Sequence, residues 1–161
     1  MTSSFHEERY YIAYGSNLNL RQMQFRCPDA RIVGTAELSG WRLMYKGSER
    51  GYYLTIEQAE GFAVPVAVWA VSEQDERSLD RYEGYPSFYY KKTLSLTLHG
   101  TESGETRSLT AFVYIMHEDR ALGRPSESYA ERCREGYEAF GFDTAYLDEA
   151  YEYSCGGKPG L

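Results

Sequence analysis

A loop of small and polar residues follows directly on an apolar segment near the start of the chain. Residues 10–14 are aromatic or aliphatic, and Gly15, Ser16 and Asn17 come next. A glycine lets the backbone approach a ligand closely, and successive N–H groups in such a turn can bind an anion. A helix that begins near Leu18 would add its unpaired N–H groups to that site. Asn17 is equally suited to be the N-cap of this helix, so the loop alone leaves both interpretations open.

Glu83 is the second candidate for chemistry, because it stands at the end of an expected helix, just before Gly84. The C-terminal end of a helix is the negative end of its dipole and disfavours an anion by roughly 0.3–1 kcal/mol. The same field raises the pKa of a carboxyl group and makes it a better general base near neutral pH. A glutamate before a C-terminal glycine is more often a solvated surface charge, and this pattern alone favours that reading.

Other kinds of site find little support in the sequence. It contains no G-x-G-x-x-G, Walker A, H-E-x-x-H or G-x-S-x-G motif. The three histidines stand apart, and the three cysteines are odd in number and widely spaced. Neither a zinc site nor a disulfide framework is therefore indicated, and we expect no metal ligands.

Charge and hydropathy limit the kinds of partner that the protein could have. The net charge is −7 and the basic residues are scattered, which argues against nucleic acid. We see no signal-peptide pattern and no apolar run near the ~20 residues of a membrane span. We therefore expect a cytoplasmic protein without a membrane partner. The sixteen tyrosines suit half-buried pocket walls, although a tyrosine-rich strand surface explains most of them as well.

The elements that must position these residues can be read from the hydrophobic pattern. We expect strands over residues 9–14, 30–38, 41–45, 52–57, 62–71, 88–98 and 108–116, with a break at Ser39-Gly40 and a turn at Glu60-Gly61. We expect helices over residues 19–26, 72–83 and 125–140, and a last helix opening at Asp143. Pro65 is expected at an edge or an interruption of the ladder.

This order disfavours a doubly wound parallel sheet, because strands and helices do not alternate regularly. We predict an α+β fold with a mixed, mostly antiparallel, barrel-like sheet and helices packed on it. We expect one domain over residues 1–161, with a core at about residues 9–153 and a flexible tail at residues 155–161.

Taken together, several short motifs resemble the γ-glutamyl cyclotransferase family, including its AIG2-like members, over residues 10–141. They are Tyr14-Gly15-Ser16-Asn17-Leu18 after an apolar strand, Leu79-Asp80-x-x-Glu83-Gly84, the pair Tyr89-Tyr90, and Pro125-Ser126-x-x-Tyr129 after a strand carrying Tyr114. The resemblance implies a barrel-like α+β fold and the release of 5-oxoproline from a small γ-glutamyl substrate, with no cofactor. It leaves a homodimer open.

The resemblance also implies roles for individual residues. The catalytic glutamate of the family matches Glu83, which would act as general base and then general acid. The substrate-binding residues implied by the match are Tyr14, Gly15, Ser16, Asn17, Leu18 and Tyr129, with Tyr89 or Tyr90 as further orienting groups.

The Gly-Ser-Asn loop favours the branch that acts on γ-glutamyl amino acids, or one that removes a γ-glutamyl cap from a biosynthetic intermediate. Similar enzymes specific for glutathione carry Leu after Gly-Ser, and those acting on γ-glutamyl-lysine amines carry Gly-Thr. Two alternatives stay open. One is an enzyme of the same fold acting on an amine or a carrier-bound γ-glutamyl intermediate, and the other is a small-acid binding module that has lost catalysis.

Overall fold

The structure is a computed structural model that describes residues 9–100 and 104–155. The strands are β1 (Arg9–Ala13), β2 (Arg31–Ser48), β3 (Gly51–Val71), β4 (Tyr89–Gly100), β5 (Thr106–Met116) and β6 (Ala121–Leu122). The helices are the 3-10 turn η1 (Ser16–Leu18), α1 (Leu20–Arg26), α2 (Glu73–Glu83), α3 (Glu127–Phe140) and α4 (Ala145–Ser154). The flexible tail expected from the sequence lies, apart from Cys155, outside the described residues.

The strands close into a barrel. Their order is β3-β1-β5-β4-β2-β6, and β2 also pairs with β3, which joins the two sides of the sheet. The pairing is antiparallel except between β1 and β5. The mixed, mostly antiparallel barrel-like sheet predicted from the sequence is therefore confirmed.

Strands β2 and β3 form one long hairpin, which corrects the expected strand breaks. The predicted break at Ser39-Gly40 is a shift of register between Ser39 and Trp41 inside a continuous β2. The predicted turn at Glu60-Gly61 lies inside a continuous β3, where Gly61 has φ +89°. An irregularity of this kind bends a strand without ending it. Pro65 pairs with β2 and lies beyond the residues of β3 that pair with β1, as expected for an interruption of the ladder.

The helix ends that frame the site follow ordinary capping rules. Ser72 Oγ accepts the N–H of Asp75, and the Asp75 carboxylate accepts the N–H of Ser72, so a capping box begins α2. Gly84, with φ +66°, ends this helix in the left-handed conformation. At α1 the N-cap is Asn19, whose side chain accepts the N–H of Gln22, so the alternative that made Asn17 the cap is wrong.

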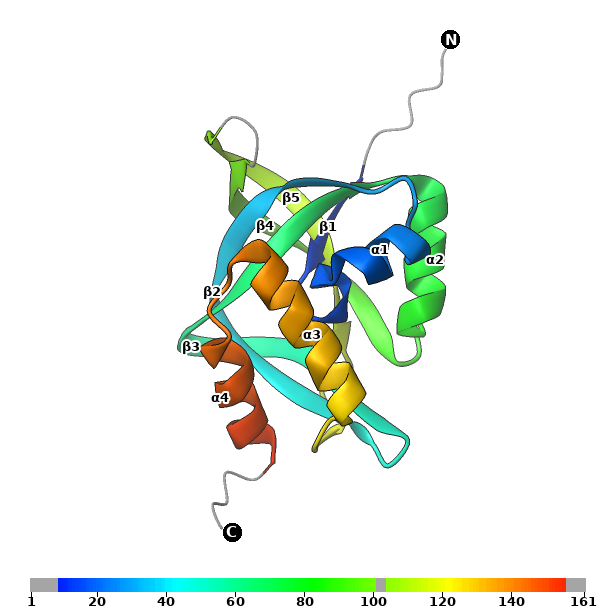
Figure 1. The fold of residues 1–161 in the computed structure, drawn as a ribbon, viewed down its shortest axis with the longest axis vertical. Helices are drawn as coiled ribbons and strands as arrows, with labels where there is room; N and C mark the ends of the chain where they lie inside the picture. The colour runs from blue at the N-terminus through cyan, green and yellow to red at the C-terminus, as the bar shows by residue number, and fades with distance from the viewer. Residues whose placement is uncertain (1–8, 101–103, 156–161) are drawn as a thin grey trace.

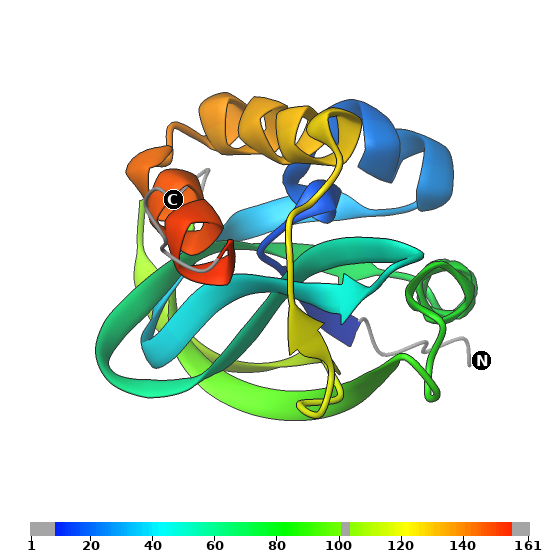
Figure 2. The ribbon, with the colours of Figure 1, turned by 90° about the horizontal axis from the view of Figure 1, so that it is seen from below.

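Helices α1 and α3 cover one side of the barrel, while α2 and α4 lie at its flanks (Figures 1 and 2). Helix α3 packs closely on η1 because it carries Gly136 at the contact. A Cβ built at Gly136 would lie 2.7 Å from the Leu18 Cβ and from the Asn19 backbone N. The lack of a side chain at Gly136 therefore brings α3 down onto the loop that follows β1.

No helix in residues 9–100 or 104–155 is long and apolar enough to cross a membrane.

Candidate active site

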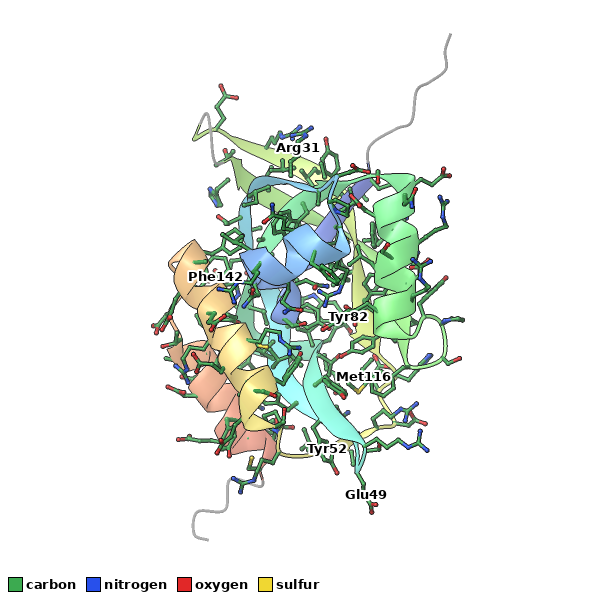
Figure 3. All side chains as sticks on the ribbon, turned by 45° about the vertical axis from the view of Figure 1, so that its right-hand side comes forward. Arg31, Glu49, Tyr52, Tyr82, Met116 and Phe142 are labelled. Atoms are coloured by element: carbon green, nitrogen blue, oxygen red, sulfur yellow. The ribbon has the colours of Figure 1, made fainter. Side chains whose placement is uncertain are left out.

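A cavity of about 460 Å³ opens beside the loop that follows β1. Its walls come from β1, η1, β3, α2, β4, β5 and α3, so segments distant in sequence meet there. The lining residues are Tyr11, Ile12, Tyr14, Gly15, Ser16, Asn17, Tyr53, Leu54, Arg81, Tyr82, Glu83, Gly84, Phe88, Tyr89, Tyr114, Tyr129 and Arg132. Figure 3 shows Tyr82 in the space between α2 and α3.

The cavity brings together most of the residues that the sequence proposed. Those that line it are Tyr14, Gly15, Ser16, Asn17, Glu83, Tyr89 and Tyr129. Leu18 and Tyr90 do not line it. Leu18 is fully buried beneath Gly136. Tyr90 follows Tyr89 in β4, and consecutive side chains of a strand point to opposite faces, so the Tyr90 hydroxyl instead donates to Glu118 at 2.5 Å.

Glu83 ends α2 with its carboxyl group in the cavity wall. The residue keeps some exposed surface, but its surroundings are poor in water, and burial raises the pKa of the carboxyl to about 8 against a weaker opposing effect of the Arg26 charge. Burial, not the helix dipole invoked from the sequence, is therefore the leading cause. No described residue donates a hydrogen bond or an ion pair to this carboxylate. Glu83 is thus not the solvated surface charge that its sequence context alone favours.

Buried tyrosines surround this carboxyl group. Tyr11, Tyr14 and Tyr89 are each at most 7% exposed. Burial raises the pKa of each of these phenols well above its usual value. The second cause is the charge of Glu83 at Tyr11 and Tyr14. At Tyr89 it is the neighbouring Tyr14, followed by Glu83. These side chains therefore stay protonated, and their hydroxyl groups remain neutral around the glutamate.

The loop is held by its side chains, which leaves its backbone N–H groups open. The Asn17 amide donates to the Tyr11 hydroxyl at 2.9 Å and accepts a hydrogen bond from Arg26. The Ser16 Oγ lies 3.0 Å from the Tyr82 hydroxyl. The N–H groups of Gly15, Ser16 and Asn17 meet no acceptor among the described residues, as is usual at the start of a helical turn. Such a row of N–H groups can bind an anion.

Two tyrosines of the cavity hold the backbone of β3. The N–H of Leu54 donates to the Tyr129 hydroxyl at 3.1 Å, and the Tyr89 hydroxyl donates to the Leu54 carbonyl at 2.8 Å. Gly15 packs against the same place, because a Cβ there would lie 3.3 Å from Leu54 and 3.5 Å from the Tyr129 hydroxyl. The Tyr129 hydroxyl keeps its own proton, which it can donate either to the Cys133 sulfur or into the cavity.

Sequence reasoning missed the residues that cover the cavity. The spacing of three residues between Leu79 and Tyr82 predicts that both lie on the inner face of α2, but Tyr82 is 38% exposed while Leu79 is fully buried. The Arg26 guanidinium lies 3.4 Å from the centre of the Tyr82 ring. Arg81 and Arg132 also line the cavity. The position of Arg81 and Tyr82 directly before Glu83 was the available signal, whereas nothing local marked Arg26 or Arg132.

No group of three or more His, Cys, Asp or Glu side chains is placed to hold a metal ion within the part of the chain that the structure describes.

The family model described as "Gamma-glutamyl cyclotransferase, AIG2-like" matches residues 11–132, so the chain belongs to this family. It is 32% identical to the Homo sapiens gamma-glutamylcyclotransferase over 97 residues, which are 56% of this chain and 52% of that one. It is 37% identical to the Mus musculus gamma-glutamylcyclotransferase over 87 residues, which are 50% and 46% of the two chains. The match therefore spans about half the length of these curated relatives.

Solved structures agree on the fold. A structure titled "Gamma-glutamyl cyclotransferase" superposes with a TM-score of 0.74 at 25% identity and covers 89% of this chain and 86% of that one. YkqA from Bacillus subtilis reaches a TM-score of 0.72 at 16% identity, with 92% of this chain and 54% of that one covered, and so shows the fold alone. The resemblance expected from the short motifs is confirmed.

Proposed function

We propose that this protein is a γ-glutamyl cyclotransferase, which releases 5-oxoproline from a γ-glutamyl amino acid or amine. The observation that carries the proposal is the Glu83 carboxyl group, which lines the cavity with no hydrogen-bond or ion-pair partner among the described residues. A pKa of about 8 places it where it can both take and return a proton near neutral pH.

The first step forms the lactam ring. The α-amine of the substrate attacks the γ-carbonyl carbon of the same molecule, so the new C–N bond is intramolecular. The protein needs only to bind the substrate in the conformation that brings the amine close to the carbonyl. An ammonium group has no free electron pair, so the attacking form is the neutral amine, which has released its ammonium proton to solvent. As the C–N bond forms, the nitrogen becomes positively charged, and Glu83 accepts a proton from it as the general base.

The second step breaks the original amide. The attack converts the γ-carbonyl into a tetrahedral carbon with a negatively charged oxygen. As that oxygen re-forms the carbonyl, the bond to the leaving nitrogen breaks with its electron pair, and Glu83 returns the proton to that nitrogen. The products are 5-oxoproline and a free amine or amino acid, so the carboxylate is regenerated in each cycle.

The loop supplies electrostatic stabilisation. The open N–H groups of Gly15, Ser16 and Asn17 lie in the same cavity as Glu83. They are suitable donors for the α-carboxylate of the substrate or for the oxyanion of the intermediate. In this proposal Tyr129, which lines the same cavity, orients the glutamyl part.

A mass-spectrometric assay for 5-oxoproline tests this function. The wild type is incubated with γ-glutamyl amino acids, γ-glutamyl amines and glutathione beside Glu83→Gln and a control, Glu152→Gln, which changes an exposed glutamate of α4. We expect product from the wild type and the control, and a loss of at least about a thousandfold in Glu83→Gln.

Equal rates in Glu83→Gln and the wild type would contradict the role of Glu83. A folded wild type that forms no 5-oxoproline but melts at a higher temperature with a γ-glutamyl compound would instead identify a binding module.

A further inference from the structure

Two arginines line the cavity from different helices. Arg81 lies near the end of α2 and is exposed, and Arg132 lies in the middle of α3 and is half-buried. Helices α2 and α3 stand on different sides of the loop that follows β1 (Figures 1 and 3). The cavity is thus bordered by a guanidinium group from each of two walls.

Neither guanidinium has a carboxylate partner among the described residues. Arg81 reaches the Ser78 hydroxyl at a long 3.4 Å, and the side chain of Arg132 makes no hydrogen bond or ion pair within the described ranges. Other arginines of these helices are paired, since Arg77 lies 3.9 Å from Glu73 and Arg134 lies 3.4 Å from Asp148. In a chain with a net charge of −7, two unpaired guanidinium groups beside one cavity are well placed to bind an added anion.

The cavity has a buried inner end and an exposed outer end, and the two halves of the substrate must lie at different ends. The tyrosines around Glu83 are buried, whereas Arg81 and Tyr82 are exposed, so the reacting end is the inner one. The amine, the γ-carbonyl and the leaving nitrogen all meet at Glu83 during the reaction. The group attached to the leaving nitrogen must therefore extend outward, where the two arginines lie.

We infer that Arg81 and Arg132 bind a carboxylate on the leaving half of the substrate, so the protein prefers γ-glutamyl amino acids to γ-glutamyl amines. This inference rests on the proposed function. A guanidinium group matches a carboxylate with two parallel N–H donors, which adds geometric selection to the attraction of charge. The loop N–H groups remain free for the anion at the inner end.

Two matched substrates isolate the carboxylate. γ-Glutamyl-alanine and γ-glutamyl-ethylamide differ only in the carboxylate of the leaving half. We expect kcat/KM for 5-oxoproline formation to be at least about tenfold higher for γ-glutamyl-alanine, which corresponds to one charge-assisted contact of ~1.4 kcal/mol. Because the arginines are partly exposed, the preference should shrink as the ionic strength rises.

Variants assign the preference to the two arginines. In the double variant Arg81→Gln/Arg132→Gln, the ratio of the two kcat/KM values should fall towards one, mainly through loss of activity on γ-glutamyl-alanine. Arg77→Gln and Arg134→Gln remove arginines from the same two helices that do not line the cavity, and the ratio should stay at the wild-type value. Thermal melting establishes that every variant is folded.

The outcomes separate the two proposals. Product from both substrates at equal kcat/KM in the wild type would overturn the leaving-group assignment and leave the cyclotransferase reaction standing. An unchanged preference in the folded double variant would also overturn the assignment to these arginines, as expected if they bind the α-carboxylate of the glutamyl half. No product from any γ-glutamyl compound would overturn the proposed function and this inference together.

Discussion

The Ser16 hydroxyl lies 3.0 Å from the hydroxyl of Tyr82, the residue before Glu83. This contact joins the loop after β1 to the last turn of α2. The loop N–H groups proposed to bind an anion and the carboxyl group proposed as the base are therefore held relative to each other by one hydrogen bond. Arg26 of α1, which donates a hydrogen bond to Asn17 in the loop and lies over the Tyr82 ring, adds a second connection between the same segments.

Removal of this hydrogen bond should loosen the loop relative to the base. We expect Tyr82→Phe, which keeps the ring for Arg26, to lower kcat/KM by about threefold to thirtyfold, with little change in the melting temperature. Ser16→Ala should give a similar loss, and the double variant should be no worse than either single one, because the two hydroxyls share one contact. Fully additive losses, measured in the same 5-oxoproline assay, would show that the two hydroxyls act separately.

The pH dependence of the reaction should report the carboxyl group. Since Glu83 must be ionised to accept a proton, kcat/KM should rise with pH up to about 8 and level off above it. The charge of Arg26 lowers the pKa of Glu83, so Arg26→Gln should move the midpoint to higher pH, whereas Arg26→Lys should leave it near the wild-type value. The same midpoint in Arg26→Gln and the wild type would exclude Arg26 as the tuning charge.

Glu83 should also couple stability to pH. Its pKa rises from about 4.5 to about 8 on folding, so the folded protein holds this proton more tightly than the unfolded chain does. Its contribution to stability is fully present below pH 4.5 and is lost as the pH rises to about 8. We therefore expect urea unfolding to show Glu83→Gln gaining stability over the wild type across this range. Glu152→Gln should show no such trend, and a constant difference for Glu83→Gln would mean that the pKa does not change on folding.

Gly136→Ala should destabilise the protein although alanine favours helices. Helix propensity alone predicts a gain of roughly 1 kcal/mol. The new Cβ, however, would lie 2.7 Å from backbone atoms of Leu18 and Asn19, which cannot move aside without shifting η1. We expect a net loss of about 1–3 kcal/mol in chemical denaturation, together with reduced activity. Increased stability would show that α3 tolerates a larger distance from the loop.

Gly15→Val should abolish most of the turnover while leaving the fold intact. Even a Cβ at Gly15 would be 3.3 Å from Leu54, and the branched methyl groups extend further, towards Leu54 or into the cavity. We expect kcat/KM to fall by about a hundredfold or more, with a change of a few degrees at most in the melting temperature. Full turnover in this variant would contradict the role of the loop backbone.

The sequence predicts local features of the fold well, because they depend on neighbouring residues. Ser72 and Ser126 stand at the start of the expected helices and Gly84 and Gly141 directly after them, and all four cap these helices, as their residue types favour. The ends of β2 and β3 could not be predicted in the same way. Ser39-Gly40 and Glu60-Gly61 have the composition of turns, but β2 and β3 pair on both sides of them. Gly40 and Gly61, with φ +85° and +89°, therefore form irregularities inside continuous strands instead of turns that end them.

For the site, the sequence motifs identify the loop and Glu83 but misjudge what acts on them. The leading cause of the raised pKa of Glu83 is burial in a cavity whose walls come from segments distant in sequence, which no local pattern reveals. Tyr89 and Tyr90 are equivalent by spacing until the strand assigns them to opposite faces. Arg132 lies almost fifty residues from Glu83 in the sequence and reaches the cavity only through the packing of α3.

The hydrogen bonds of Tyr129 and Tyr89 to the Leu54 backbone give these tyrosines a structural role that Glu83 lacks. These tyrosines satisfy the N–H and the carbonyl of a buried strand position, so each would be retained even in a descendant that no longer turned over substrate. Glu83 has no such structural role, because no described residue forms a hydrogen bond or an ion pair with its carboxylate. Its burial also lowers the stability of the folded state once the carboxyl group is ionised. Selection for the folded state alone would therefore not preserve Glu83, whereas it would preserve both tyrosines.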